Sequence, residues 1–240
     1  MLFRSIDDLD RLSKDEILIV FKLVKLLADF ENITYVVAID FNQVNSLLSL
    51  NSNDASKYLE KIFSSIIEVP ELPPQLLRSF TTSEFGRIIS GTDYENRIIQ
   101  NHWDKVYSDV IQPIIKTPRD VKRICQNLFY CFHVEKLIVN PVDIIAMETI
   151  RVIKPDVFHE IFRNASYLTS YNNLSSQIQR TDFHPLRESY LSDPEWTNNL
   201  IASLFQFANQ YIGNTSYTRE FESIWIRERR VATKIGRAHV

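Results

Sequence analysis

Two adjacent carboxylates near the start of the chain, Asp7 and Asp8, stand where an apolar stretch meets the start of a helix. In nucleotide-hydrolysing domains, a pair of acids at the end of a buried strand holds magnesium and activates the attacking water. Magnesium uses one or two carboxylates together with phosphate oxygens. The pair therefore predicts a metal ligand at Asp7 and a catalytic general base at Asp8. The alternative interpretation is a solvated turn that leads into a helix.

A third acid, Asp40, ends the β-rich residues 33–39 (ITYVVAI). Carboxyl ends of parallel strands meet at one edge of a sheet, where ligands bind. Asp40 is therefore a candidate nucleotide-binding residue that senses the γ-phosphate through water. It could equally cap a helix that begins at Phe41, and the residues alone do not separate these two roles.

Arg119 is the strongest basic candidate. Thr117 and Pro118 form a helix-start signature, with threonine as cap and proline in the first turn. An arginine in that first turn could stabilise charge on a transferred phosphoryl group. Lys122 and Arg123 follow on the same helix, where we expect them to be solvated or paired. The alternative is that all three residues form only a charged helix face.

Composition excludes several classes of site. The chain has a formal net charge of −3, so no basic face is expected and nucleic acid is not a favoured partner. No apolar stretch approaches the roughly 20 residues that span a bilayer. Cys125 and Cys131 lie six residues apart on different helix faces and predict reduced packing residues of a cytoplasmic protein. None of the glycines forms a phosphate-cradling loop: Gly86, Gly91, Gly213 and Gly236.

The periodicity of the sequence predicts the elements that position these residues. Residues 13–16 form a capping box, which begins a helix that reaches about Asp29. Arg11, just before this box, is expected to pair with Asp10. Residues 33–39 predict a strand buried on both faces, and residues 66–69 another strand, stopped by Pro70. Helices are expected at 41–50, 56–63, 75–90, 94–115, 118–134, 141–152, 155–168, 194–212 and 217–232, with a polar loop at 169–182.

This order of elements predicts an α/β fold. It corresponds to the C-terminal half of a parallel sheet with flanking helices, followed by a purely helical part, so the chain is predominantly helical overall. Residues 1–5 (MLFRS) are too few and too polar to form the buried strand that Asp7 requires. Residues 1–5 and 235–240 can also be encoded by a DNA string and its reverse complement, as a ligated sequencing adapter would leave. We therefore expect that residues 6–234 are natural and that the protein continues in both directions.

Several segments in order resemble the KAP family of P-loop NTPases, a branch of the STAND-type ATPases. The resemblance runs from Ile6 to about Pro155, with a weaker similarity near the C-terminus, where residues 225–231 resemble the stretch before the family's C-terminal aromatic motif. The segments that carry it are 6–12 (IDDLDRL), 35–40 (YVVAID), 58–62 (YLEKI), 72–74 (LPP) and 117–123 (TPRDVKR). The family's Walker A loop and transmembrane segments would precede Ile6.

The resemblance implies ATP and Mg²⁺ as cofactors. It makes Asp7 the Walker B magnesium ligand and Asp8 the catalytic acid, with Asp40 and Arg119 binding nucleotide. It divides the chain into the NTPase core at 6–78, a helical lid at 79–168, and a linker with C-terminal helices at 169–234. Residues 1–5 and 235–240 remain as adapter-derived ends.

The resemblance also implies a molecular switch or scaffold that is driven by ATP hydrolysis and inactive here for lack of Walker A. The expected partners are ATP and other proteins or a second copy, at a cytoplasmic location. A membrane would be reached only through segments outside this chain. The alternatives are a non-enzymatic helical protein-interaction module and another STAND or AAA-like ATPase.

Overall fold

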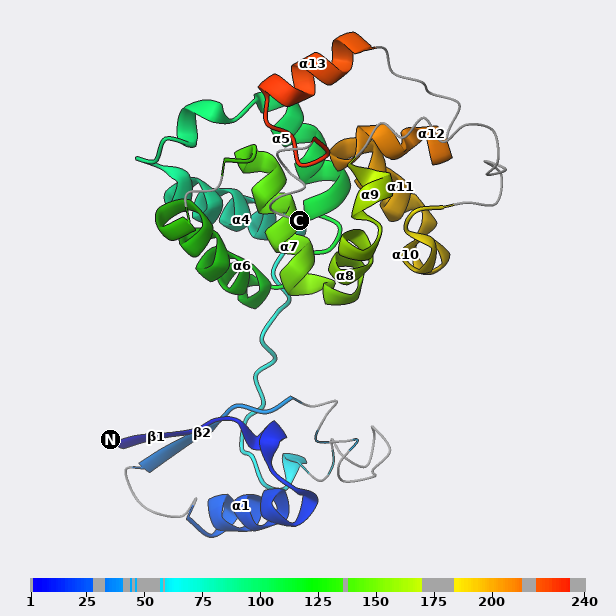
Figure 1. The fold of residues 1–240 in the computed structure, drawn as a ribbon. Helices are drawn as coiled ribbons and strands as arrows, with labels where there is room; N and C mark the ends of the chain where they lie inside the picture. The colour runs from blue at the N-terminus through cyan, green and yellow to red at the C-terminus, as the bar shows by residue number, and fades with distance from the viewer. Residues whose placement is uncertain are drawn as a thin grey trace. The chain divides into compact units, whose positions relative to one another are not determined.

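The computed structural model describes residues 2–27, 33–40, 44, 46, 57, 59–135, 138–169, 184–212 and 219–233. The chain divides into two compact units, Met1–Glu71 (unit 1) and Leu72–Val240 (unit 2) (Figure 1). Unit 1 contains a small parallel sheet, whereas the described part of unit 2 is helical. This arrangement confirms the expected mixture of a parallel sheet with a predominantly helical remainder.

The sheet of unit 1 has two parallel strands, β1 (Leu2–Ile6) and β2 (Ile33–Val37). Their register places Ile6 opposite Val37. Parallel strands cannot be joined by a tight turn, and α1 (Lys14–Leu27) forms part of the connection between them. The short 3₁₀ helix η1 (Leu9–Arg11) leads from β1 into this helix.

Residues 2–6 form β1, although residues 1–5 were expected to be too few and too polar for a buried strand. Backbone pairing with β2 supplies the hydrogen bonds that a strand needs. The side chains of Arg4 and Ser5 are exposed, so their polarity carries no burial penalty. The polar composition that argued against a buried strand is therefore compatible with a strand that is partly open to solvent.

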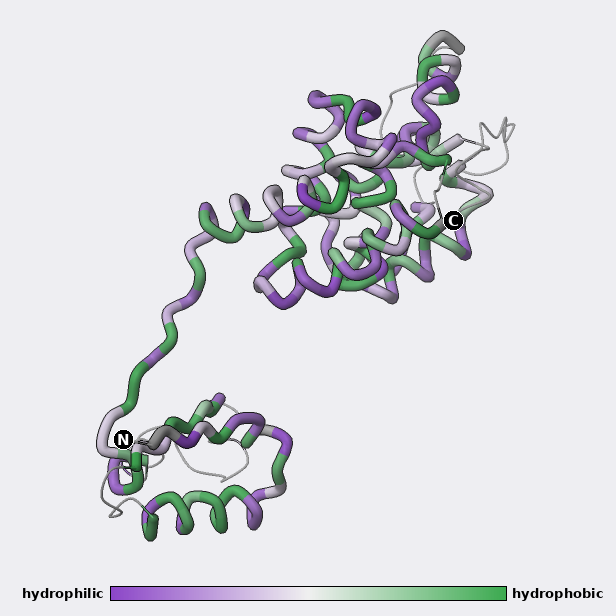
Figure 2. Tube along the Cα trace, turned by 90° about the vertical axis from the view of Figure 1, so that its left-hand side faces the viewer, coloured by the Kyte–Doolittle hydropathy of each residue, from purple (hydrophilic) through white to green (hydrophobic). Residues whose placement is uncertain are grey.

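One face of α1 forms the small core of unit 1. Ile17, Phe21 and Val24 are buried, and the ring of Phe21 meets Phe63 edge-on at 5.6 Å between centroids. The helix is hydrophobic along much of its length (Figure 2). Its start follows the predicted capping box in part, because Glu16 accepts hydrogen bonds from both the backbone N–H and the hydroxyl of Ser13.

The strand expected at residues 66–69 is not formed. This stretch runs without strand pairing towards Pro73, and Ile67 and Val69 are 85% and 91% exposed. A strand exists only where its backbone groups have a ladder partner, and none of the described residues supplies one here. The helix expected at 41–50 and the loop at 169–182 lie largely outside the described residues. Of the helix expected at 56–63, residues 57, 59 and 60 are helical and residues 61–62 form a turn.

The described residues of unit 2 form helices of several kinds. Pro74, Pro118, Pro141, Pro155 and Pro194 each begin a helix, a position where proline's missing N–H costs nothing. The α-helices are α4 (Pro74–Ile89), α5 (Gln100–Val106), α6 (Pro118–Tyr130), α7 (Pro141–Ile153), α8 (Pro155–Arg163), α9 (Ala165–Leu168), α10 (Arg187–Ser192), α11 (Pro194–Leu204), α12 (Asn209–Ile212) and α13 (Arg219–Arg227). Between them lie the 3₁₀ helices η2 (Glu95–Arg97) and η5 (Gln206–Ala208) and the π-helices η3 (Tyr107–Ile111) and η4 (Cys131–Glu135).

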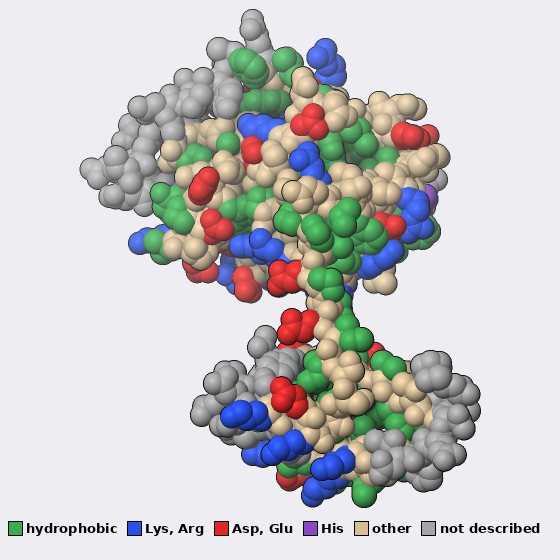
Figure 3. Space-filling model, turned by 180° about the vertical axis from the view of Figure 1, so that it is seen from behind, with side chains coloured by type: hydrophobic (Ala, Val, Ile, Leu, Met, Phe, Trp, Pro, Cys, Tyr) green, Lys and Arg blue, Asp and Glu red, His purple; other side chains and the backbone are tan. Residues whose placement is uncertain are grey.

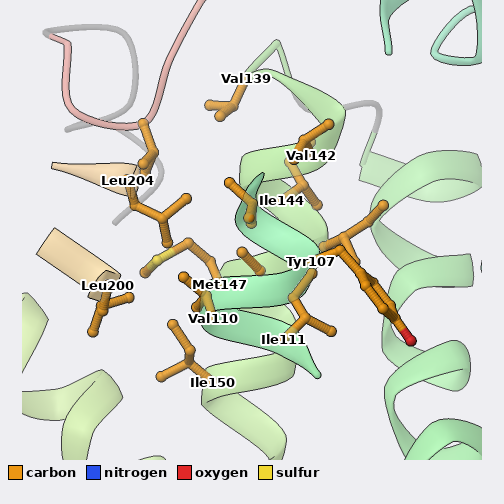
Figure 4. Packing of buried hydrophobic residues seen from close by; sticks show 14 of the residues in the cluster. Tyr107, Val110, Ile111, Val139, Val142, Ile144, Met147, Ile150, Leu200 and Leu204 are labelled. Carbon is orange, nitrogen blue, oxygen red and sulfur yellow. The ribbon is translucent and has the colours of Figure 1, made fainter. Parts of the chain in front are cut away.

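Helix α7 lies at the centre of the unit 2 core. It packs against α5, η3, α6 and α8, and most of its side chains are buried. Ile150 and Met147 of α7 lie in the same cluster as Val110 of η3 and Leu200 of α11 (Figure 4). A helix that is apolar on nearly all sides belongs in the interior. No helix among the described residues has the length and hydrophobicity to cross a bilayer.

Candidate functional site

The carboxyl ends of β1 and β2 lie at the same edge of the sheet. The backbone N–H of Ala38, just after β2, donates to the carbonyl of Ile6 at 2.9 Å, so the parallel pairing continues to the last residue of β1. Asp7 and Asp8 follow immediately, and Asp40 lies two residues beyond Ala38. All three carboxylates are exposed to solvent. The structure therefore brings the three predicted acids to the edge where the sequence analysis expected them.

Asp8 has an unusual backbone conformation. Its φ and ψ are 60° and 30°, in the left-handed region. Aspartate tolerates this region better than most residues, because its short polar side chain bonds locally. The backbone N–H of Asp8 donates to Oδ1 of Asp7 at 2.8 Å. The sharp turn thus orients one oxygen of Asp7 towards the chain and projects the Asp8 side chain from the end of β1.

Arg11 is the cationic partner of Asp8. Its Nη2 lies 3.2 Å from Oδ1 of Asp8, and the side chains are 74% and 57% exposed. The side chain of Asp10, the partner expected for Arg11, lies outside the described part of the chain. The 3₁₀ helix η1 aligns residues three apart, so Asp8 and Arg11 face each other. An ion pair this exposed is weak, and the Asp8 carboxylate stays accessible to solvent.

The backbone carbonyl of Asp40 has a hydrogen-bond partner four residues along the chain. The carbonyl of Asp40 accepts the backbone N–H of Val44 at 2.9 Å, the spacing of an α-helical hydrogen bond. Asp40 therefore lies at the sheet edge, and both of its predicted roles, as a nucleotide-binding residue and as a helix cap, stay predictions.

Arg119 lies in unit 2, exposed in the first turn of α6. The predicted cap is confirmed: the Thr117 side chain accepts the N–H of Asp120, and Asp120 accepts the N–H of Thr117 in return at 3.0 Å. Among the described residues, the Arg119 guanidinium forms neither a hydrogen bond nor an ion pair. It is the cation of this helix that is available to a ligand.

The other two basic side chains of α6 form contacts with protein groups, as expected. Lys122 Nζ lies 2.9 Å from a carboxylate oxygen of Glu84, and Arg123 donates to the carbonyl of Val152. The hydrogen bond from Lys122 lowers the pKa of Glu84, with a further contribution from Arg87. On the face of unit 2 in Figure 3, basic and acidic side chains are interspersed.

A buried polar cluster in unit 2 was not identified from the sequence. Asp143 of α7 is fully buried, and its carboxylate accepts bonds from Nε of Arg230 (3.0 Å to Oδ2) and the backbone of Val231 (2.7 Å). Nε2 of His102 lies 2.7 Å from the other oxygen. Burial opposes ionisation, yet Arg230 and His102 outweigh it and hold the pKa of Asp143 below its usual value. The available signal was a lone acid, Asp143, near the start of a very apolar helix.

The acids of unit 1 suit a magnesium ion that also binds phosphate. Among the described residues, no three histidine, cysteine or acidic side chains gather as a metal site of their own. Asp7 and Asp8 nevertheless offer adjacent exposed carboxylates. Magnesium keeps several waters and takes one or two protein carboxylates, with phosphate oxygens completing its octahedron. The residues present therefore fit a metal that arrives with a nucleotide.

A family model described as the KAP family P-loop domain matches residues 5–133. The chain belongs to this family. The resemblance drawn from the sequence is thereby confirmed. The KAP match includes Asp7, Asp8, Asp40 and Arg119, runs from unit 1 into unit 2 and ends within η4. Asp143 and Arg230 lie outside the matched residues.

A curated relative of this KAP chain is the phage T7 exclusion protein of Escherichia coli strain K12. The two sequences are 22% identical over 185 residues, which cover 74% of this chain and 25% of the relative. The chain thus spans about a quarter of the length of that relative. No solved structure matches the chain.

Proposed function

We propose that this chain is part of an ATP-hydrolysing switch of the KAP family. Asp7 is the proposed magnesium ligand, and Asp8 the acid that orients and deprotonates the attacking water. One observation carries the proposal: both acids directly follow β1 at the carboxyl edge of a parallel sheet, within a P-loop family match. Ligands of open parallel sheets bind at this edge.

The turn at Asp8 supports different roles for the two acids. The Asp8 N–H occupies one oxygen of Asp7, which leaves the second oxygen for magnesium or for one of its waters. The Asp8 carboxylate contacts an exposed arginine, Arg11. Such a pair in solvent exchanges readily with water. Asp8 is therefore the acid with freedom to accept a proton from water.

Asp40 and Arg119 are the proposed nucleotide-binding residues. Asp40 shares the sheet edge with the acid pair and would sense the γ-phosphate through a water molecule. Arg119 belongs to the helical unit, whose proposed role is that of a lid. Its guanidinium has no competing acidic partner among the described residues and would stabilise charge on the phosphoryl group. Closure of the lid upon ATP would then depend on Arg119.

The 240-residue chain by itself is expected to be inactive. Tight binding of ATP phosphates requires a loop of backbone amides and a lysine, with the pattern G-x-x-x-x-G-K-[ST]. The four glycines of this chain do not form that pattern. We propose that this loop belongs to sequence that precedes Ile6 in the intact protein.

The test is ATP hydrolysis by the intact protein, once its complete reading frame is recovered. We expect an upstream phosphate-binding loop and magnesium-dependent turnover. Asp8→Asn should lower kcat by about 100-fold or more while ATP binding persists, in line with the loss of a general base. Asp7→Asn should weaken the magnesium dependence of ATP binding. Asp15→Asn, an exposed acid on α1, is the matched control and should leave both properties unchanged.

Two results would contradict the proposal. One is an intact protein that neither contains the loop nor binds ATP. The other is full turnover by the Asp8→Asn variant. Turnover by the 240-residue chain alone, abolished by Asp8→Asn, would overturn the expectation that this chain is inactive.

A further inference from the structure

The 3₁₀ turn between the proposed base, Asp8, and its partner Arg11 is anchored in the core of unit 1. Leu9 is 1% exposed and belongs to the same hydrophobic cluster as Ile17 and Phe21 of α1. The backbone N–H of Arg11 donates to the carbonyl of Asp8 at 3.1 Å, which closes the turn. The fold therefore fixes the backbone of Asp8 relative to that of Arg11, independently of the contact between their side chains.

Arg11 engages one of the two carboxylate oxygens of Asp8. Its Nη2 lies 3.2 Å from Oδ1, and no group among the described residues pairs with Oδ2. An arginine keeps its positive charge at any pH at which a protein works. The pair therefore holds Oδ1 with a permanent cation and leaves Oδ2 as the oxygen that can take a proton from water.

The side-chain pair adds little to the stability of the turn. Both side chains are more than half exposed, and ion pairs in open solvent are weak. Leu9 and the backbone hydrogen bond already hold the turn. The same pair becomes stronger when a bound substrate excludes water, because the attraction between charges rises as the local dielectric constant falls. The contribution of Arg11 is therefore expected at the stage when substrate is bound.

We propose that Arg11 is a positioning residue of the ATPase site, which holds the Asp8 carboxylate by Oδ1 so that Oδ2 faces the attacking water. This inference rests on the proposed function of Asp8. As the water oxygen forms its bond to the γ-phosphorus, Oδ2 takes the water proton. The bond from phosphorus to the bridging oxygen breaks, and its electron pair leaves with ADP. The effect of Arg11 on the rate passes entirely through Asp8.

The geometry favours this role over direct binding of phosphate by Arg11. The guanidinium already faces an anion in its own turn, and a phosphate that displaced this anion would release the base at the moment when the base is needed. Arg119, in contrast, has no acidic partner among the described residues and is available to a phosphoryl group. The two arginines therefore have different roles, one towards the base and one towards the substrate.

Single-turnover ATP hydrolysis and equilibrium ATP binding by the intact protein test this role. Arg11→Gln should lower the rate constant of hydrolysis by about tenfold, because a poorly placed general base loses much of its effect, and should leave the Kd for ATP unchanged. Arg11→Lys keeps a cation near Oδ1 and should recover part of the lost rate. Lys22→Gln, an exposed cation of α1, is the matched control and should behave as the wild type.

A double-mutant cycle separates positioning of the base from contact with the substrate. In the Asp8→Asn background there is no base to position, so Arg11→Gln should change the hydrolysis rate by less than about twofold. An equal loss in both backgrounds, or weaker ATP binding by Arg11→Gln, would assign Arg11 to the phosphate and overturn the proposal. A wild-type rate in Arg11→Gln, or a lysine variant as slow as the glutamine variant, would overturn it as well.

Two further readings keep the result unambiguous. Hydrogen exchange of the β1 and β2 amides should be the same in the Arg11 variants as in the wild type, and faster exchange would mean that Arg11 acts on the fold instead of on Asp8. Full turnover by Asp8→Asn alone contradicts the proposed function itself. Loss of turnover in Asp8→Asn together with full turnover in Arg11→Gln contradicts only the role of Arg11.

Discussion

Asp143 and Arg230, 87 residues apart in sequence, form an ion pair in the interior of unit 2 with Nε and Oδ2 3.0 Å apart. The Asp143 side chain is fully buried, and that of Arg230 is 5% exposed. Loss of one partner leaves the other as an uncompensated charge away from water. Pairs of this kind are sensitive to the removal of either member even when their net stabilisation is small.

Asp143→Asn should therefore lower the free energy of unfolding of unit 2 by about 3–5 kcal/mol. Urea unfolding followed by tryptophan fluorescence measures this change selectively, because Trp103, Trp196 and Trp225 all belong to unit 2. Arg87→Gln is the control: Arg87 is 70% exposed and pairs with Glu84 at 3.1 Å. We expect that this variant costs less than about 1 kcal/mol. Equal effects of the two variants would contradict a buried pair.

The contribution of Asp143 should depend on pH in a defined direction. Although burial opposes ionisation, Arg230 and His102 lower the pKa of Asp143 in the folded state. A depressed folded pKa stabilises the protein above the ordinary aspartate value, about 3.9, and the stabilisation is lost as the pH falls through the folded value. The difference in stability between the wild type and Asp143→Asn should thus be constant from pH 7 to pH 5 and shrink below about pH 4. Urea titrations at each pH provide the measurement, and a difference that shrinks already at pH 6 would contradict it.

The left-handed turn at Asp8 predicts an unusual order of stability among variants at this position. Asp8→Gly and Asp8→Ala both remove the pair with Arg11, but only glycine adopts a φ of 60° without strain. The glycine variant should be more stable than the alanine variant by about 1 kcal/mol. Hydrogen exchange of the β1 and β2 amides measures this difference in stability. Tryptophan fluorescence cannot be used for it, because unit 1 contains no tryptophan. Alanine and glycine variants of equal stability would mean that the turn at Asp8 is not retained in solution.

Cys125 should be unreactive in the folded protein. Burial raises the pKa of its thiol to about 11, so at pH 8 only about 0.1% is the nucleophilic thiolate. Alkylation by iodoacetamide, followed by mass spectrometry, should label Cys125 at least 100-fold more slowly in buffer than in urea. Both cysteines are buried, as expected of packing residues. Rapid labelling of Cys125 in buffer would contradict the packing of α6.

The sequence predicted best where a local physical rule decides the outcome. Thr117 was identified as a helix start because cap and proline chemistry acts within a few residues, and its side chain accepts the expected backbone N–H. The shared location of the acid pair and Asp40 was predicted from the rule that the carboxyl ends of parallel strands lie at one edge of the sheet. The strand expected at residues 66–69 was wrong because strand formation depends on a partner, which β-propensity alone does not reveal.

Contacts between distant segments were beyond what the sequence could show. Nothing near Asp143 indicates that a guanidinium from residue 230 will neutralise it, and His102 has no neighbour that hints at its acidic partner. The pair of Arg11 with Asp8 was likewise not predicted, because it depends on a 3₁₀ turn that aligns residues three apart. Local sequence predicts helix ends well. It does not predict ion pairs between buried residues that are far apart in the chain.

The end of the family match has a practical consequence for anyone who prepares shorter versions of this protein. The match stops at residue 133, inside η4. A recombinant piece that ended there would expose the apolar surfaces of α5, η3 and α6 that α7 covers. Such a piece should precipitate upon expression, whereas one that begins near Leu72 and extends through Thr233 retains every described residue of the helical unit and should stay in solution.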